Sequence, residues 1–103
     1  MQLIVEITNI TDWDHFPGWV ACRFYDAHGV EHVIAEKIPV VTDQNITPDS
    51  TFPRKGEVRC TLLGRWTDTA GRELVTVSTR IPDYVETIDG VFEFDVMASQ
   101  IEE

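Results

Sequence analysis

The sequence predicts an all-β domain, and three features of the 103-residue chain lead to that class. Apolar and polar residues alternate with the two-residue period of strands in several short segments. Asp-x-x-Gly turn signals separate two pairs of these segments. No segment of ten or more residues has the period of an amphipathic helix. We therefore expect one domain, residues 1–103, folded as a small six-stranded antiparallel barrel or barrel-like sandwich.

The expected strands are six segments in which one parity of positions is apolar and the other polar or mixed. They are residues 3–8, 19–25, 30–38, 56–66, 72–80 and 91–97. Tight turns at 26–29 and 68–71 join the second strand to the third and the fourth to the fifth, so each of these pairs should form a hairpin.

Two segments rich in proline and turn-forming residues are expected to be loops, residues 39–55 and 81–90. The first is much longer than the usual connection of about 4–6 residues, and the sequence leaves open whether it is functional or merely mobile. A helical turn is expected at 47–50, because Thr47 can cap a helix and Pro48 suits its first position.

The two expected hairpins resemble each other in sequence. Segments 18–22 and 56–60 both read G-x-V-x-C, each is followed by an Asp-x-x-Gly turn, and each returning strand ends in a basic residue followed by Ile-Pro. One interpretation is a duplicated hairpin unit. The alternative is that hairpins in general need glycine, Asp-x-x-Gly and proline at these positions.

The chain carries 18 acidic and 8 basic side chains, for a formal net charge of −10 at pH 7. This charge repels nucleic-acid phosphates and favours a basic protein as partner. The alternative is that the acidity only keeps a small protein soluble.

The sequence gives no sign of export or of a membrane. It contains no apolar stretch of membrane-spanning length, and its first residues reach Glu6 without the basic start of a signal peptide. We therefore expect a cytoplasmic protein without membrane contact, in which Cys22 and Cys60 are free thiols that pack inward.

The densest group of functional side chains follows the first expected strand: Asp12, Trp13, Asp14, His15, Phe16 and Trp19. Two carboxylates beside a histidine could perform acid–base chemistry. Exposed aromatic residues could instead form the centre of a protein interface, or the loop could simply carry capping aspartates. We treat these six residues as the candidate partner-binding site.

Catalysis and metal binding find little support in the sequence. Asp26, His28 and His32 could supply three ligands, but their spacing is not that of a typical zinc site. There is no G-x-S-x-G motif, no phosphate-binding glycine loop and no reactive cysteine context. We therefore expect no enzyme activity, no metal and no cofactor.

Six of the eight basic side chains lie in residues 54–80. Those expected on one outer face are Arg59, Arg65, Arg72 and Arg80. Such a patch could bind nucleic acid, but a barrel that does so needs interleaved aromatic residues and only Trp66 qualifies. We favour the alternative, in which these arginines pair across strands with Glu93 and Asp95.

These observations favour a non-catalytic protein-interaction or accessory module, for example an acidic inhibitor or immunity-type protein that binds a basic enzyme. A small-ligand-binding barrel is the alternative, with an end opening surrounded by Trp13, Trp19, Tyr25 and Trp66. Nucleic-acid binding through residues 54–80 is the third hypothesis. A homodimer joined through an edge strand is also open.

Overall fold

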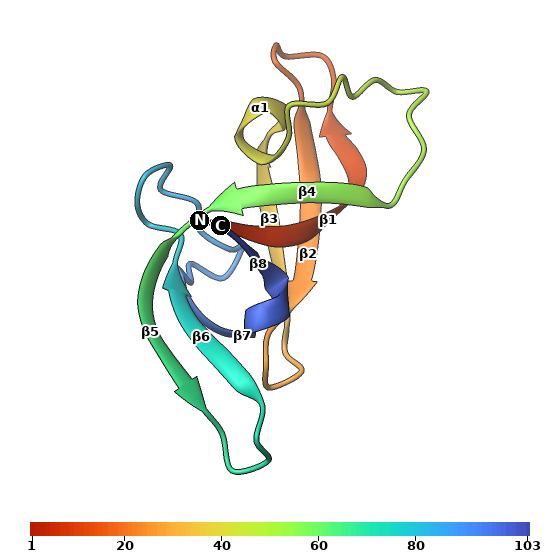
Figure 1. The fold of residues 1–103 in the computed structure, drawn as a ribbon. Helices are drawn as coiled ribbons and strands as arrows, with labels where there is room; N and C mark the ends of the chain where they lie inside the picture. Colours follow the sequence, from red (N-terminus) through yellow and green to blue (C-terminus); the bar gives the residue numbers. More distant parts are fainter.

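Two antiparallel sheets form the structure, a computed structural model that describes all 103 residues (Figure 1). The all-β prediction is confirmed, although the barrel is not closed and a sandwich describes the fold better. The elements are β1 (Gln2–Asp12), β2 (Trp19–Tyr25), β3 (Glu31–Lys37), α1 (Ile38–Val41), β4 (Arg54–Arg59), β5 (Thr61–Thr67), β6 (Glu73–Ser78), β7 (Glu93–Met97), the 3₁₀ turn η1 (Ala98–Gln100) and β8 (Ile101–Glu102).

The larger sheet is built around β1. Its strand order is β3-β2-β1-β4, and the short β8 pairs with the first residues of β1. Leu3 therefore lies between Val58 of β4 and Ile101 of β8, and farther along the same strand Ile7 pairs with Cys22 of β2. The smaller sheet has the order β5-β6-β7. Since β1 contacts three other strands, it organises the larger sheet.

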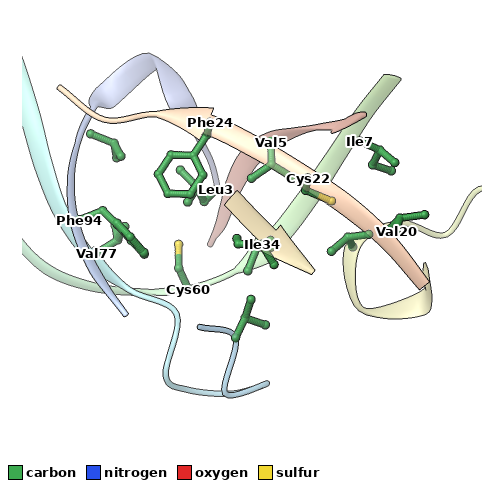
Figure 2. Packing of buried hydrophobic residues seen from close by; sticks show 14 of the residues in the cluster. Leu3, Val5, Ile7, Val20, Cys22, Phe24, Ile34, Cys60, Val77 and Phe94 are labelled. Carbon is green, nitrogen blue, oxygen red and sulfur yellow. The ribbon is translucent and has the colours of Figure 1, made fainter. Parts of the chain in front are cut away.

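The core lies between the two sheets and is built from buried side chains of most strands, although β5 contributes none (Figure 2). The ring of Phe24 from the larger sheet meets the ring of Phe94 from the smaller one edge to face, with centroids 5.0 Å apart. The most deeply buried side chains from the strands are Leu3, Val5, Ile7, Val20, Cys22, Ile34, Val58, Leu74, Val75, Val77 and Val96. This alternation is the pattern from which the strands were predicted.

The prediction of one strand at 56–66 is wrong, because the chain changes sheets at Cys60. The N–H of Cys60 donates a hydrogen bond to the carbonyl of Met1 (3.0 Å), which ends the pairing of β4 beside β1. From Thr61 onward the chain pairs with β6 instead. A two-residue alternation continues through such a change of sheet, so periodicity could not locate it.

The 39–55 segment also differs from expectation. The helix lies at α1, with Pro39 in its first turn, whereas residues 47–50 form a turn closed by the N–H of Ser50 and the carbonyl of Thr47 (2.9 Å). Ile46 is buried in the core, so the connection is anchored midway. Neither α1 nor η1 has the length and apolarity needed to cross a membrane.

The two Asp-x-x-Gly turns have the same geometry. Asp26 and Asp68 each accept two backbone N–H groups through Oδ1, from residues two and four positions later. The preceding strands differ, since residues 18–22 run into β2 of the first hairpin while residues 56–60 run through β4 beside β1. The duplication of a hairpin unit therefore stays a prediction.

Both cysteines are buried free thiols. Burial, with a smaller contribution from the charge of Glu36, raises the pKa of Cys22 to about 12, and burial also raises the pKa of Cys60. A thiol that stays protonated at neutral pH packs as a small apolar group.

A matched pair of isoleucine substitutions tests the assignment of the core. Ile34 of β3 is 0% exposed, whereas Ile88 is 67% exposed. We expect Ile34→Ala to lower the free energy of unfolding by about 2–5 kcal/mol, because it leaves a cavity. Ile88→Ala should change it by less than about 0.5 kcal/mol. Chemical denaturation followed by tryptophan fluorescence measures both, and equal losses would contradict the assignment.

Candidate functional site

The β1–β2 loop, residues 13–18, is folded around the side chain of Asp12. Oδ1 of Asp12 accepts the backbone N–H groups of Asp14 (2.9 Å) and His15 (3.3 Å), and its Oδ2 lies 2.8 Å from Nδ1 of His15. The N–H of Gly18 donates to the carbonyl of His15 (2.8 Å), which closes the loop. Asp12 thus has the capping role that the sequence left open as one alternative.

Gly18 lets this loop pack tightly against the rest of the domain. Its φ is +88°, a conformation that favours glycine, and a Cβ there would lie 2.9 Å from Cδ1 of Ile38 and 3.2 Å from the ring of Trp13. The carbonyl of Gly18 accepts the N–H of Ile38 (3.0 Å). The loop is therefore held between β2 and the start of α1.

The predicted partner-binding residues divide into a support and an exposed surface. Asp12 supports the loop, Trp13 lies half-exposed over Gly18, and Trp19 is partly buried with Nζ of Lys37 5.7 Å from its ring centroid. Phe16 is 99% exposed, although a phenylalanine side chain is among the most apolar. The neighbouring side chains of Asp14 and His15 are also exposed.

The 42–53 connection and the 13–18 loop lie at the same end of the molecule, the end at which α1 is found (Figure 1). Neither segment contains a lysine or an arginine. Their aspartates Asp14, Asp43 and Asp49 form no ion pair within the chain and are exposed to solvent. We call the surface formed by residues 13–18 and 42–53 the loop face. It combines negative charge with one prominent aromatic side chain.

Comparisons with protein families, with curated proteins and with solved structures found no match to this chain.

The Asp12–His15 pair has the residue types of an acid–base site, but it does not lie in a cleft that could hold a substrate. The hydrogen bond to the His15 ring, aided by the backbone N–H of Asp14, lowers the pKa of Asp12. Both side chains are accessible to water, and the larger hollows of the surface are lined by other residues. The pair can exchange a proton with solvent, but no surrounding wall positions a substrate over it.

Those hollows are open grooves. One, of about 560 Å³, lies between α1 and β4 and includes Asp43, Glu57, Arg59 and Asp83. Another, of about 510 Å³, lies beside β1, β2 and η1 and includes Tyr25.

The four aromatic residues expected around an end opening are not brought together. Trp13 and Trp19 lie near the start of β2, Tyr25 ends that strand, and Trp66 belongs to the other sheet.

The arginines of the predicted basic patch are each engaged, but not by the predicted partners. Arg59 binds Asp83 through two hydrogen bonds (2.9 and 2.7 Å). Arg65 forms an ion pair with Glu103 (3.1 Å) and Arg72 with Asp68 (2.7 Å), and the guanidinium carbon of Arg80 lies 4.0 Å from the ring centroid of Phe92. The expected pairing with Glu93 and Asp95 is wrong, because loops and the C-terminal residues supply the carboxylates.

Asp95 instead belongs to a network of histidines and aspartates that joins the two sheets. Its Oδ2 lies 3.1 Å from Nε2 of His28, and its Oδ1 accepts the hydroxyl hydrogen of Thr76 (2.7 Å). Nearby, Nε2 of His32 lies 2.8 Å from Oδ2 of Asp26.

The histidines of this network thus bind different aspartates. No cluster of three potential metal ligands occurs in the chain, so Asp26, His28 and His32 do not converge as a metal site would require.

A second exposed apolar surface was not predicted. The loop between β6 and β7 presents Ile81, Tyr84 and Ile88 to solvent, while buried Thr79 and Val85 hold it through a backbone hydrogen bond (3.0 Å). The sequence did contain a signal for this surface, because apolar residues occur among the turn-forming residues of segment 81–90.

The Asp26–His32 pair yields a prediction about pH. Burial alone would raise the pKa of Asp26, but hydrogen bonds from His32 and from the backbone of Val30 and His28 lower it below 3.8. A carboxylate of this kind stabilises the fold above its unfolded pKa, and the contribution is lost as the pH falls through the folded value. Asp26→Asn should therefore reduce the free energy of unfolding above pH 3.8, and the difference from the wild type should shrink below it.

Asparagine retains an oxygen for the turn, so this change removes mainly the charge beside His32. Urea denaturation over a pH series measures the effect, and Asp49→Asn, which alters an exposed unpaired carboxylate, is the control. A deficit in Asp26→Asn that persists unchanged at low pH would contradict the assignment.

Proposed function

We propose that this protein is a non-catalytic interaction module whose loop face binds a basic protein. The observation that carries the proposal is Phe16, an almost fully exposed aromatic side chain on a loop held in shape by Asp12 and Gly18. Aromatic residues that become buried on binding provide much of the energy of protein interfaces. A preorganised loop also loses little conformational entropy on binding.

The charge of the loop face supports a basic partner. Several basic side chains outside it are neutralised within the chain, for example by the pairs Arg23–Glu6, Arg59–Asp83 and Arg72–Asp68. Asp14, Asp43 and Asp49 keep their charge available. An excess of negative charge at one end of the molecule steers a basic protein toward it and increases the association rate.

An acidic inhibitor or immunity-type protein that blocks a basic enzyme is one concrete form of this proposal. A cytoplasmic location belongs to the same proposal. The alternatives have less support. A ligand-binding barrel needs an enclosed apolar pocket, whereas the grooves of this protein are open to solvent. Nucleic-acid binding needs arginines that are free to contact phosphates, whereas three of the four arginines in the patch are already paired with carboxylates.

The binding test uses the immobilised protein to capture partners from native lysate, followed by titration with the purified partner. We expect a basic protein that binds with one-to-one stoichiometry and whose affinity falls as salt is raised. Phe16→Ala should weaken binding by about 30-fold, equivalent to about 2 kcal/mol. Asp14→Asn should mainly slow association.

The matched controls are Ile88→Ala and Glu86→Gln, which remove an exposed apolar side chain and a carboxylate outside the loop face. Both should bind as the wild type does. Unfolding of Phe16→Ala should also be unchanged, because the side chain is exposed. A partner whose affinity is unchanged both by added salt and by Phe16→Ala would refute the proposal.

A further inference from the structure

Strand β5 is an exposed edge away from the loop face. It lies at one side of the β5-β6-β7 sheet, and Figure 1 shows the β5–β6 hairpin projecting from the body of the molecule. All of its residues except Gly64 are exposed. Among them Leu63 is 52% exposed and Trp66 is 40% exposed. Apolar edge strands of this kind readily pair with another chain.

The other edges of the two sheets are protected. On β3 the carbonyl of Val33 accepts the N–H of Ile88 (2.9 Å), and on β7 the carbonyl of Asp95 accepts the N–H of Ala27 (2.7 Å). The edge strand β4 carries four charged side chains among its six residues. In contrast, β5 forms backbone hydrogen bonds only with β6 and carries one charged residue, Arg65.

Gly64 lies where β5 is irregular, because the register with β6 shifts between Leu62 and Gly64. Glycine in a strand interior lowers stability and often marks a bulge or a place where a second backbone comes close. Here φ is not left-handed, and a Cβ on Gly64 would meet no atom within 4 Å. Neither the backbone nor the packing of the isolated chain therefore requires glycine at this position.

The charges of β5 fit a second copy of the same chain. Two molecules of net charge −10 repel each other, but β5 contains no carboxylate and its only cation is paired with Glu103 at 3.1 Å. Contact along β5 thus brings together strands that carry no carboxylate of their own, and the charge of each Arg65 is already neutralised by Glu103.

We propose that β5 pairs antiparallel with β5 of a second copy, around a twofold axis at Arg65, to form one six-stranded sheet across the dimer. In this register Gly64 of each copy lies opposite Trp66 of the other, on the face of the sheet that carries Leu74 and Thr76. An aromatic ring laid over the bare backbone of a cross-strand glycine stabilises such a pair. The self-complementary contact closes after two copies, as a twofold interface must.

The first test is the mass in solution, measured by sedimentation equilibrium over a micromolar dilution series. The wild type should approach twice the 11.7 kDa mass of the chain. A wild type that remains monomeric over the whole series would overturn the proposal.

Gly64→Val then distinguishes the dimer from a merely exposed strand. A β-branched residue suits a strand, and open space surrounds the position, so the isolated chain should be at least as stable as the wild type. The same side chain would occupy the place of Trp66 of the second copy, so dimer dissociation should increase by at least tenfold. An equally tight Gly64→Val dimer would rule out this register.

Leu63→Lys provides a second variant, because a lysine on an edge strand opposes pairing. It should yield monomers, whereas the control Ile88→Lys, which changes an exposed apolar residue outside β5, should remain dimeric. If Leu63→Lys also remained dimeric, the copies would meet at another surface and the proposal would fail.

Discussion

The structure depends on the pairing of both edges of β1. This strand supplies Leu3, Val5 and Ile7 to the core while its backbone pairs with β4 on one side and with β8 and β2 in succession on the other. Side chains of a paired strand alternate strictly between the two faces, so a shift of one residue would move these core residues to the surface. The registers of four strands are thereby coupled. The sandwich follows from this coupling, because the smaller sheet covers the face that β1 makes apolar.

The distribution of charge has a physical consequence beyond solubility. A net charge of −10 would ordinarily produce a diffuse negative field. The arginines of the body form pairs such as Arg59–Asp83 and Arg72–Asp68, which cancel locally, while segments 13–18 and 42–53 contain aspartates and no lysine or arginine. Unpaired carboxylates therefore lie in the same two segments as the most exposed aromatic side chain. Exposed ion pairs contribute little to stability, so their main effect here is on where the uncompensated charge remains.

The junction of the two sheets uses polar as well as apolar contacts. The ring of His32 lies between Phe24 and Phe94, with centroid distances of 5.1 and 4.8 Å, while its Nε2 reaches Asp26. A histidine in such a place packs its ring against aromatic neighbours and also has a hydrogen-bond partner for its ring nitrogen. Asp26 also closes the adjacent turn. One aspartate thus connects the local geometry of a hairpin with the packing of the two sheets.

The sequence by itself determined the strand-rich class, the inward parity of most strands, both Asp-x-x-Gly turns and the cluster from Asp12 to Trp19, because each is encoded within a few neighbouring residues. Only the tertiary structure decided that segment 56–66 is divided at Cys60 between two sheets, that α1 precedes the 42–53 connection, and that Arg59 and Arg65 pair with Asp83 and Glu103. It also separated Asp12, which supports its loop, from Phe16, which faces solvent. Periodicity records which face a residue occupies, but not which strand or loop lies opposite, since that depends on contacts between segments far apart in the chain.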